Sequence, residues 1–298
     1  MTKLLKFNRL LCQFNRIPEY MPLYQTLKAL NSARSSYKGN ALGVVPTMGA
    51  LHQGHLSLIK KAKHNNEVVW VTIFVNPTQF DKKDDLDKYP NSLAEDVAAI
   101  HEISPDINIF APTASDMYPK GLLAITQTFD GLDKSMEGAD RPGHFDGVIT
   151  IIAKLFKTLQ PHRAYFGEKD FQQLQLIKKW AKEQQIPTSI VPCPIVREAN
   201  GLALSSRNAQ LAPKQREEAG FIYEAMLHCK NNCLDKADVY STIKQAFEVH
   251  PNFDLYYVLC AEEDSLKEVK ELATANKPRL FVAASIAGVR LIDNIALK

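Results

Sequence analysis

Short runs of β-branched and aromatic residues alternate with longer, helix-like stretches along the first two thirds of the chain. The runs short enough to form buried strands are 41–46, 68–75, 107–110, 163–166 and 189–196. The helix-like stretches between them are 54–64, 92–103, 146–159 and 170–185. Because the strand runs are almost uniformly apolar, both faces of their sheet should be covered by helices. This alternation predicts an α/β fold built on a doubly wound parallel sheet.

The pattern changes after about residue 196. Helix-like stretches follow at 213–232 and 236–249, and strand-like stretches at 253–260 and 279–293. We therefore expect a Rossmann-like domain over residues 1–195, with its ligand site at the carboxyl ends of the strands. A smaller α+β domain over residues 196–298 should act as a lid, with the active site between the two domains.

Composition limits the classes of partner. With 45% hydrophobic residues, 23% charged residues and a net charge of +3, the 298-residue chain resembles an ordinary globular protein. Its basic residues are scattered, so we expect small-molecule substrates and no nucleic acid. No apolar run approaches the roughly 20 residues of a membrane helix, so we expect no membrane partner. Five cysteines form no even framework, which predicts free thiols and a cytoplasmic location.

Two histidines flank a glycine where a predicted strand passes into a helix, in PTMGALHQGHLSLIKKA at 46–62. Gly49 allows a tight turn, and Gly54 lets the backbone approach a ligand. A helix start presents unpaired N–H groups and a positive dipole end, which together favour phosphate. His52 and His55 lie about one turn apart and can reach the same anion. Two alternatives remain open: ordinary helix-capping residues and, with less support, a metal pair.

A second strand-to-helix passage lies in FGEKDFQQLQLIKKW at 166–180. Here Lys169 can bring a positive charge toward phosphate, and Asp170 is expected to cap the following helix. Solvation of Lys169 is the alternative. The passage occupies the same topological place as the one that carries His55.

A serine-rich loop follows the last strand of the large domain, in NGLALSSRNAQL at 200–211. Arg207 can fork onto phosphate oxygens, and Ser205 and Ser206 can donate to them. Such a set suits charge that develops on a leaving diphosphate. Helix capping is the plainer alternative for these serines.

Neutral amides and a charge-dense run follow another predicted strand. Asn76 and Gln79, in NPTQF, should point into the crevice and suit hydroxyl groups or a carboxylate. The run DKKDDLDKYP at 81–90 is either a solvated loop or a lid.

The segments PTMGALHQGH, FVNPTQF, RPGHFDGV, YFGEKDFQQL and LSSRN, in this order, resemble the pantothenate synthetase (pantoate–beta-alanine ligase) family of the HxGH nucleotidyltransferase superfamily. The resemblance runs from about residue 21 to residue 295. It implies ATP-dependent condensation of (R)-pantoate with beta-alanine through a pantoyl adenylate, giving pantothenate, AMP and diphosphate. It also implies a requirement for Mg²⁺, carried with ATP without a metal site of the protein's own, and a homodimer.

The resemblance further assigns site residues. ATP-binding positions are Met48, Gly49, Ala50, Leu51, His52, Gln53, Gly54, His55, Gly167, Glu168, Lys169, Asp170, Val196, Leu204, Ser205, Ser206 and Arg207. His55 would be catalytic, with His52, Lys169 and Arg207 controlling charge. Substrate-binding positions are Gln79 and Gln173 for pantoate, with Gln79 also meeting beta-alanine, and Asn76, Arg141 and His144 beside them.

The chain departs from the family pattern at two places. Asn91 stands where the family usually has arginine after Tyr-Pro, and residues 1–20 are expected to be a dispensable extension. The residues alone leave other functions open: an adenylyltransferase that keeps the nucleotide on its product, a tRNA-charging enzyme, which would need a further domain, and a non-enzymatic binding module. They also leave open whether His52, a phosphate oxygen or solvent is the base for the beta-alanine amine.

Overall fold

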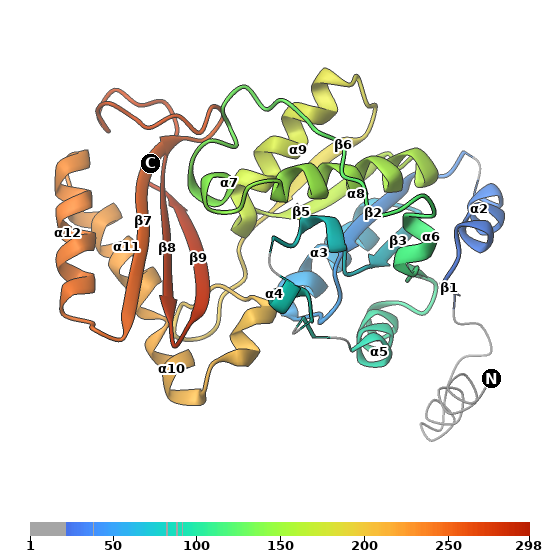
Figure 1. The fold of residues 1–298 in the computed structure, drawn as a ribbon, viewed down its shortest axis with the longest axis horizontal. Helices are drawn as coiled ribbons and strands as arrows, with labels where there is room; N and C mark the ends of the chain where they lie inside the picture. The colour runs from blue at the N-terminus through green and yellow to red at the C-terminus, as the bar shows by residue number, and fades with distance from the viewer. Residues whose placement is uncertain (1–21, 38, 82, 88, 91) are drawn as a thin grey trace.

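A computed structural model describes residues 22–37, 39–81, 83–87, 89–90 and 92–298, and two sheets lie within them (Figure 1). The larger sheet contains β1 (Leu23–Tyr24), β2 (Leu42–Thr47), β3 (Val68–Ile73), β4 (Asn108–Phe110), β5 (Arg163–Gly167) and β6 (Ser189–Cys193). Its strand order is β1-β4-β3-β2-β5-β6, and every neighbouring pair is parallel. The predicted doubly wound parallel sheet is therefore confirmed.

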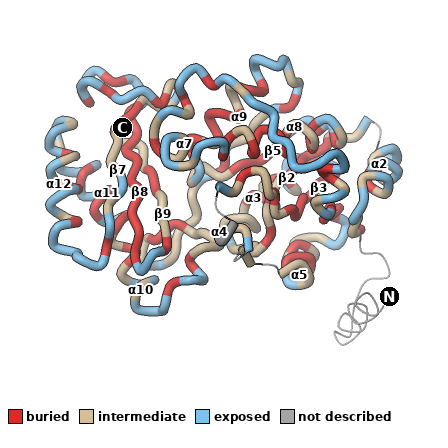
Figure 2. Tube along the Cα trace, viewed as in Figure 1, coloured by how far each residue is buried: buried red, intermediate tan, exposed pale blue. Residues whose placement is uncertain are grey.

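Helices cover both faces of this sheet. The helices of this part of the chain are α2 (Leu27–Ser35), α3 (Gln53–Asn65), α4 (Lys83–Asp87), α5 (Leu93–Ile103), α6 (Ala114–Met117), α7 (Met136–Asp140), α8 (His144–Leu159) and α9 (Phe171–Glu183). Val44 and Trp70 pack with residues of α8 and α9, whereas their neighbours Val45 and Val71 pack with residues of α3 and α5. Successive strand residues thus enter opposite cores, which explains the uniform apolarity; each buried side chain contributes about 1.5–3 kcal/mol. Figure 2 shows the central strands β2 and β3 as mostly buried, whereas the edge strands β1 and β6 are more accessible.

The order of the strands places a crevice between β2 and β5. From β2 the chain moves outward through β3 to β4, and from β5 it moves in the opposite direction to β6. Ligands of doubly wound sheets bind at such a switch point, outside the carboxyl ends of the strands. Here those ends are Thr47 and Gly167, and the predicted phosphate-binding turns follow directly after them.

The C-terminal part forms a three-stranded antiparallel sheet covered by helices (Figure 1). Its elements are α10 (Pro213–Glu218), α11 (Phe221–Asn232), α12 (Lys236–Glu248), β7 (Phe253–Glu262), β8 (Pro278–Ile286) and β9 (Val289–Ala296). Their buried side chains form a core of their own. The predicted smaller α+β unit is confirmed, while the exact boundary between residues 195 and 196 stays a prediction.

Several elements differ in detail from the sequence expectation. The stretch 213–232 is two helices, and at the break the Asn200 amide donates to the carbonyls of Arg216 and Glu217 at 2.9 and 3.0 Å. The stretch 279–293 is a hairpin whose turn residues Ala287 and Gly288 both have positive φ (51° and 76°), as a type I′ turn requires. Strand β6 ends at Cys193, three residues short of the predicted end.

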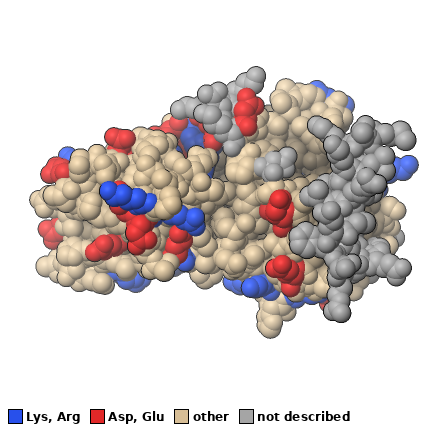
Figure 3. Space-filling view, turned by 90° about the horizontal axis from the view of Figure 1, so that it is seen from below, with Lys and Arg blue, Asp and Glu red and all other residues tan. Residues whose placement is uncertain are grey.

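Four of the five cysteines lie in the described residues. Cys193, Cys229, Cys233 and Cys260 are free thiols. None of the helices in the described ranges is long and apolar enough to span a membrane. On the face in Figure 3, the coloured basic and acidic side chains are interspersed over the C-terminal unit. Cys12 and the expected extension at 1–20 lie outside the described residues.

Candidate active site

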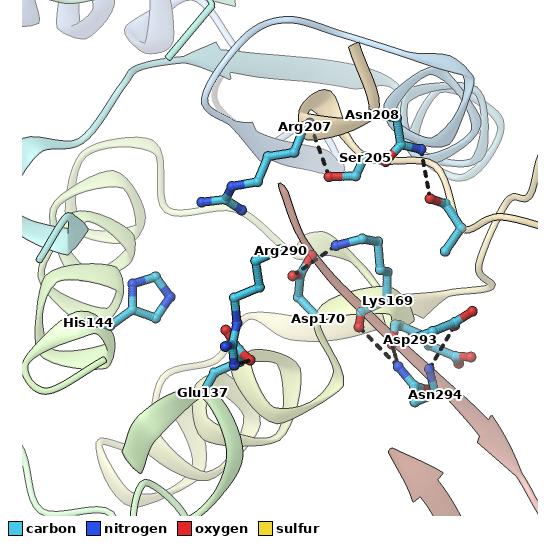
Figure 4. Close-up of polar contacts among 12 residues, drawn as sticks. Glu137, His144, Lys169, Asp170, Ser205, Arg207, Asn208, Arg290, Asp293 and Asn294 are labelled. Atoms are coloured by element: carbon cyan, nitrogen blue, oxygen red, sulfur yellow. Dashed lines mark hydrogen bonds and ion pairs between the residues drawn. The ribbon is translucent and has the colours of Figure 1, made fainter. Parts of the chain in front are cut away.

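Two adjoining cavities open where the carboxyl ends of β2 and β5 meet β9 of the C-terminal sheet. The first has a volume of about 240 Å³ and the second of about 310 Å³. Residues that line both are Arg141, His144, Lys169, Asp170, Gln173, Ser205 and Arg207. Figure 4 shows several of these side chains around one shared space. The cavities are therefore two parts of one site between the two sheets.

Asp96 holds the turn that leads to the two histidines. Gly49 and Ala50 have φ values of +86° and +51°, a left-handed conformation that costs energy at alanine. The Asp96 carboxylate accepts the N–H of Ala50 at 2.9 Å and that of Leu51 at 2.7 Å. Burial raises the pKa of Asp96, against the opposing effect of these bonds. Sequence reasoning missed this residue, whose only signal is an acid in the first turn of a predicted helix.

His52 and His55 are neutral donors in this site. The Nδ1 atom of His52 accepts from Gly54 N–H at 3.2 Å, and that of His55 accepts from His52 N–H at 3.4 Å. The protons of the neutral rings must then lie on Nε2. Burial and Lys169 lower the pKa of His52 to about 4, and burial and His52 lower that of His55 to about 3. His52 is also the N-cap of α3, so the capping alternative is confirmed, while a ligand role stays a prediction.

Gly54 is needed for this arrangement of rings. A Cβ at position 54 would lie 2.8 Å from Cε1 of His52, closer than real contacts allow. The ring centroids of His52 and His55 are 4.1 Å apart, with an interplanar angle of 33°. Glycine thus leaves room for His52 to fold back over the helix start beside His55.

Lys169 and Asp170 lie in η2 (Glu168–Asp170), a short turn between β5 and α9. The prediction that Asp170 caps α9 is wrong, because its side chain makes no capping hydrogen bond. Its Oδ1 instead lies 3.4 Å from Lys169 Nζ. Burial disfavours the ionised carboxylate, but Lys169 and Arg207 outweigh it and lower the pKa of Asp170. The backbone of Asp170 (φ −91°, ψ 59°) lies outside the extended region typical of a capping residue, and its carboxylate lines both cavities.

The serine-rich loop reaches the histidine turn through Ser206, whose hydroxyl donates to the Ala50 carbonyl at 3.1 Å. Ser205 caps η3 (Ser206–Gln210) by accepting from Arg207 N–H at 3.3 Å. The Arg207 guanidinium donates to Asp85 of α4 at 3.0 Å, and both side chains are 32% exposed. A pair this exposed is weak, so an incoming anion can displace Asp85 from Arg207.

Asn76 orients Gln79 at the end of β3. The Asn76 amide donates to Gln79 Oε1 and to the Gly147 carbonyl, both at 3.0 Å, and accepts from Tyr118 at 2.6 Å. All its bonds are thus internal, although it lines the first cavity. Gln79 Nε2 has the Met48 sulfur, a weak acceptor, at 3.1 Å. This Nε2 is therefore the amide group available to a substrate.

Arg141 and His144 hold the backbone of Gln79. Burial, reinforced by Arg141, lowers the pKa of His144 to about 4, so its ring is neutral at pH 7. Its Nδ1 lies 2.7 Å from the Gln79 carbonyl and must carry the proton, while Nε2 accepts from Arg141 at 3.4 Å. Arg141 Nε also lies 3.5 Å from Asp81. The Gln173 side chain, which lines both cavities, makes no hydrogen bond with any described residue.

The structure brings most of the predicted site residues to one cavity. The predicted residues that line the first cavity are Met48, His52, Gly54, His55, Asn76, Gln79, Arg141, His144, Gly167, Lys169, Asp170, Gln173, Val196, Leu204, Ser205, Ser206 and Arg207. The others belong to the supporting backbone and line neither cavity: Gly49, Ala50, Leu51, Gln53 and Glu168. Tyr89 also lines the first cavity and was not predicted. Asn91 lies outside the described residues.

The sequence profile of the pantoate-beta-alanine ligase family matches residues 22–296. The chain belongs to this family. A pantothenate synthetase of Flavobacterium psychrophilum is 46% identical over 259 residues, which cover 86% of this chain and 92% of the relative. These matches confirm the resemblance to the family that the sequence motifs show.

Solved structures of the family have the same fold. A crystal structure of pantothenate synthetase from Thermus thermophilus superposes with a TM-score of 0.87 at 37% identity, covering 93% of this chain and 99% of that one. A crystal structure of pantoate-beta-alanine ligase from Francisella tularensis, complexed with beta-gamma ATP and beta-alanine, superposes with a TM-score of 0.79 at 38% identity. It covers 93% of this chain and 98% of that one.

Proposed function

We propose that the protein is an AMP-forming ligase that condenses (R)-pantoate with beta-alanine to give pantothenate, on the route to coenzyme A. One observation carries the proposal. In a member of the pantoate–beta-alanine ligase family, His55, Lys169 and Arg207 come from three separate segments and line one cavity at the switch point of the sheet. These groups suit a triphosphate: His55 is a neutral hydrogen-bond donor, Lys169 is a positive point charge, and Arg207 is a planar guanidinium that can bind two phosphate oxygens.

The first step joins pantoate to the nucleotide. A pantoate carboxylate oxygen attacks the α-phosphorus of ATP, and the bond from that phosphorus to the bridging oxygen breaks as diphosphate leaves. The carboxylate is already ionised at neutral pH, so this step needs charge control and no strong base. The Nε2–H groups of His52 and His55, with Lys169 and Arg207, can stabilise the charge that develops on the phosphates.

Magnesium would enter with ATP. The described residues contain no group of three or more His, Cys, Asp or Glu side chains able to hold a metal ion. Mg²⁺ commonly uses one or two carboxylates together with substrate phosphates, and the ionised Asp170 in the cavity fits this donor set. When bound, the ion would neutralise part of the phosphate charge.

The second step forms the amide bond. The beta-alanine amine attacks the carbonyl carbon of the pantoyl adenylate, AMP leaves, and the amine loses a proton. Gln79 and Gln173 line the first cavity with uncharged amides that would bind pantoate, and Gln79 would also contact beta-alanine. His52 carries its proton on Nε2, and its Nδ1 already accepts a hydrogen bond from the Gly54 N–H. Its ring can therefore donate a hydrogen bond but has no free nitrogen to accept the amine proton. We therefore assign the base to a phosphate oxygen or solvent.

The proposed function can be tested by a reaction that lacks beta-alanine. The protein, MgATP and pantoate are mixed, and the bound products are analysed after an acid quench. The proposal predicts one pantoyl adenylate and one diphosphate per active site, followed by AMP and pantothenate when beta-alanine is added. A nucleotide-like acceptor in place of pantoate serves as the control. Diphosphate release with that acceptor and not with pantoate would identify an adenylyltransferase, and no ATP turnover with either would identify a binding module.

We propose in addition a cytoplasmic homodimer, with residues 1–195 binding nucleotide and pantoate and residues 196–298 closing over them. The described free thiols are suited to a reducing compartment. Leu122, Leu123 and Ile125 are 56%, 71% and 47% exposed, a local apolar surface that a second copy could cover. Light scattering tests the oligomeric state: a monomer at all concentrations would contradict the dimer.

A further inference from the structure

Asn294 of β9 reaches from the C-terminal sheet to the turn that carries Lys169. Its Nδ2 donates to the carbonyl of Glu168 at 2.9 Å and to that of Lys169 at 3.0 Å (Figure 4). The side chain is 2% exposed, so these contacts are shielded from water. Two successive carbonyls of η2 are thus held by one amide from an element 125 residues away.

The amide is itself held from behind. Arg279 Nη1 donates to Asn294 Oδ1 at 2.6 Å, and Arg279 is 8% exposed. The Arg279 guanidinium pairs with Glu263 at 2.6 Å and lies 4.1 Å from the ring centroid of Phe171, the first residue of α9. Asn294 therefore cannot rotate its amide without losing the Arg279 bond, and its two donors stay aimed at η2.

We propose that Asn294 is a positioning residue, which holds Lys169 at the phosphates of ATP from the C-terminal sheet. The inference rests on the proposed function. Lys169 has a long, flexible side chain, and its aim depends on the backbone from which it starts. The hydrogen bonds fix both peptide carbonyls around that starting point. Asn294 lines the second cavity, but both of its N–H donors are used by the carbonyls of Glu168 and Lys169, so it acts through the backbone of Lys169.

The neighbouring Asp293 makes a parallel connection to the loop that carries Arg207. Its carboxylate is 6% exposed and accepts from Arg197 Nη2 at 2.9 Å. Arg197 Nη1 also donates to the Gly201 carbonyl at 3.0 Å, six residues before Arg207. Adjacent residues of β9 thus contact the turn that carries Lys169 and the segment that leads to Arg207.

Only an amide can serve at position 294. It combines two N–H donors for the carbonyls with one oxygen acceptor for Arg279. Aspartate has nearly the same shape but places an oxygen against two carbonyl oxygens, so Asn294→Asp removes both donors and introduces repulsion. A displacement of about 1 Å at a reacting group can reduce a rate about 100-fold. We expect this scale of loss in adenylate formation, with little change in pantoate affinity.

The test is a double-mutant cycle in single-turnover adenylate formation, with the single variants Asn294→Asp and Lys169→Ala and the double variant. If Asn294 acts through Lys169, Asn294→Asp costs about 100-fold alone and no more than about twofold when Lys169 is already alanine. Equal losses in both backgrounds, or a normal rate for Asn294→Asp, would overturn the inference. If Asn294→Asp does not fold, Asn294→Ser, which keeps one donor, takes its place in the same cycle.

Asn66 provides a matched control for a purely structural loss. Its Nδ2 donates to the Ala62 carbonyl at 2.8 Å and its Oδ1 accepts from Arg163 at 3.2 Å, and it lines neither cavity. Asn66→Asp should reduce stability without any coupling to Lys169→Ala. Wild-type protein is measured in the same series. No adenylate from wild type would contradict the proposed function, whereas adenylate from wild type with no effect of Asn294→Asp would contradict only this inference.

Discussion

The backbone N–H of His52 donates to the Nδ1 atom of His55 at 3.4 Å, which leaves the Nε2–H of His55 as its free donor. The residue that begins the helix thereby sets the tautomer of the residue one turn later. We predict that His55→Ala slows adenylate formation by about two to three decades, the usual cost of one preorganised donor.

His55→Gln offers a sharper comparison, since a glutamine Nε2–H lies near the position of the imidazole Nε2–H. It should recover part of the rate that alanine loses, while pantoate affinity stays close to wild type in both variants. Rapid-quench measurement of the first turnover and equilibrium pantoate titration separate the two quantities. Equal rates for alanine and wild type would show that His55 does not act on the phosphates.

Burial of neutral histidine also predicts how stability depends on pH. Burial and His52 lower the pKa of His55 from 6.5 to about 3, so below pH 6.5 the unfolded chain binds a proton that the folded chain does not. The contribution of neutral His55 to the free energy of unfolding is complete above pH 6.5 and is lost as the pH falls toward 3. Between pH 6.5 and pH 5 the loss for His55 alone is about 2 kcal/mol in the free energy of unfolding.

Denaturant unfolding at pH 7 and pH 5 checks this prediction. The difference between the two pH values should be smaller for His55→Gln than for wild type, because glutamine does not titrate. His228→Gln, at an exposed position of α11, should behave as wild type. An unchanged pH difference in His55→Gln would mean that His55 is not held neutral in the folded protein.

The turn at Gly49 and Ala50 should depend on Asp96. Asp96→Asn keeps the shape but replaces one acceptor oxygen with a donor that faces a backbone N–H. We expect a loss of about 1–3 kcal/mol in the free energy of unfolding and weaker ATP binding. Glu95→Gln, an exposed change in the same helical turn, is the control. Normal stability and normal nucleotide affinity in Asp96→Asn would contradict this role.

Asp85 pairs with Arg207, so we expect it to compete with the triphosphate for that side chain. Asp85→Asn should therefore tighten binding of ATP, by up to about fivefold, since an exposed ion pair is worth about 0.2–1 kcal/mol. Calorimetric titration of a non-hydrolysable ATP analogue measures the change, and Arg207→Gln should remove the difference between the two residues at position 85. Weaker binding in Asp85→Asn would mean that the carboxylate serves the ligand, for example through magnesium.

The sequence was most informative about elements whose signal is local. Uniformly apolar strands predicted a sheet covered on both faces, and the strand-to-helix passages predicted where His55 and Lys169 lie. The two-residue strand β1 is too short to show any period, and the break before α11 involves hydrogen bonds from the distant Asn200 side chain. The expected capping role of Asp170 was wrong because its backbone (φ −91°, ψ 59°) does not adopt the extended conformation of a capping residue.

The residues that support the site were missed for a similar reason. Asp96 acts on Leu51 across 45 residues, Asp85 on Arg207 across 122, and Asn294 on Lys169 across 125. The sequence around an isolated aspartate or asparagine does not predict which distant backbone group its side chain will bind. The groups predicted to bind the ligand lie at turns with a recognisable sequence pattern. The groups that orient them can be identified only in the folded structure.

A structure of the protein with a non-hydrolysable ATP analogue and pantoate would test the central claim most directly. The account predicts phosphate oxygens within hydrogen-bond distance of His55 Nε2, Lys169 Nζ and the Arg207 guanidinium, with the α-phosphorus facing the pantoate carboxylate beside Gln79. A triphosphate bound elsewhere, with these three side chains contacting only solvent or one another, would contradict it.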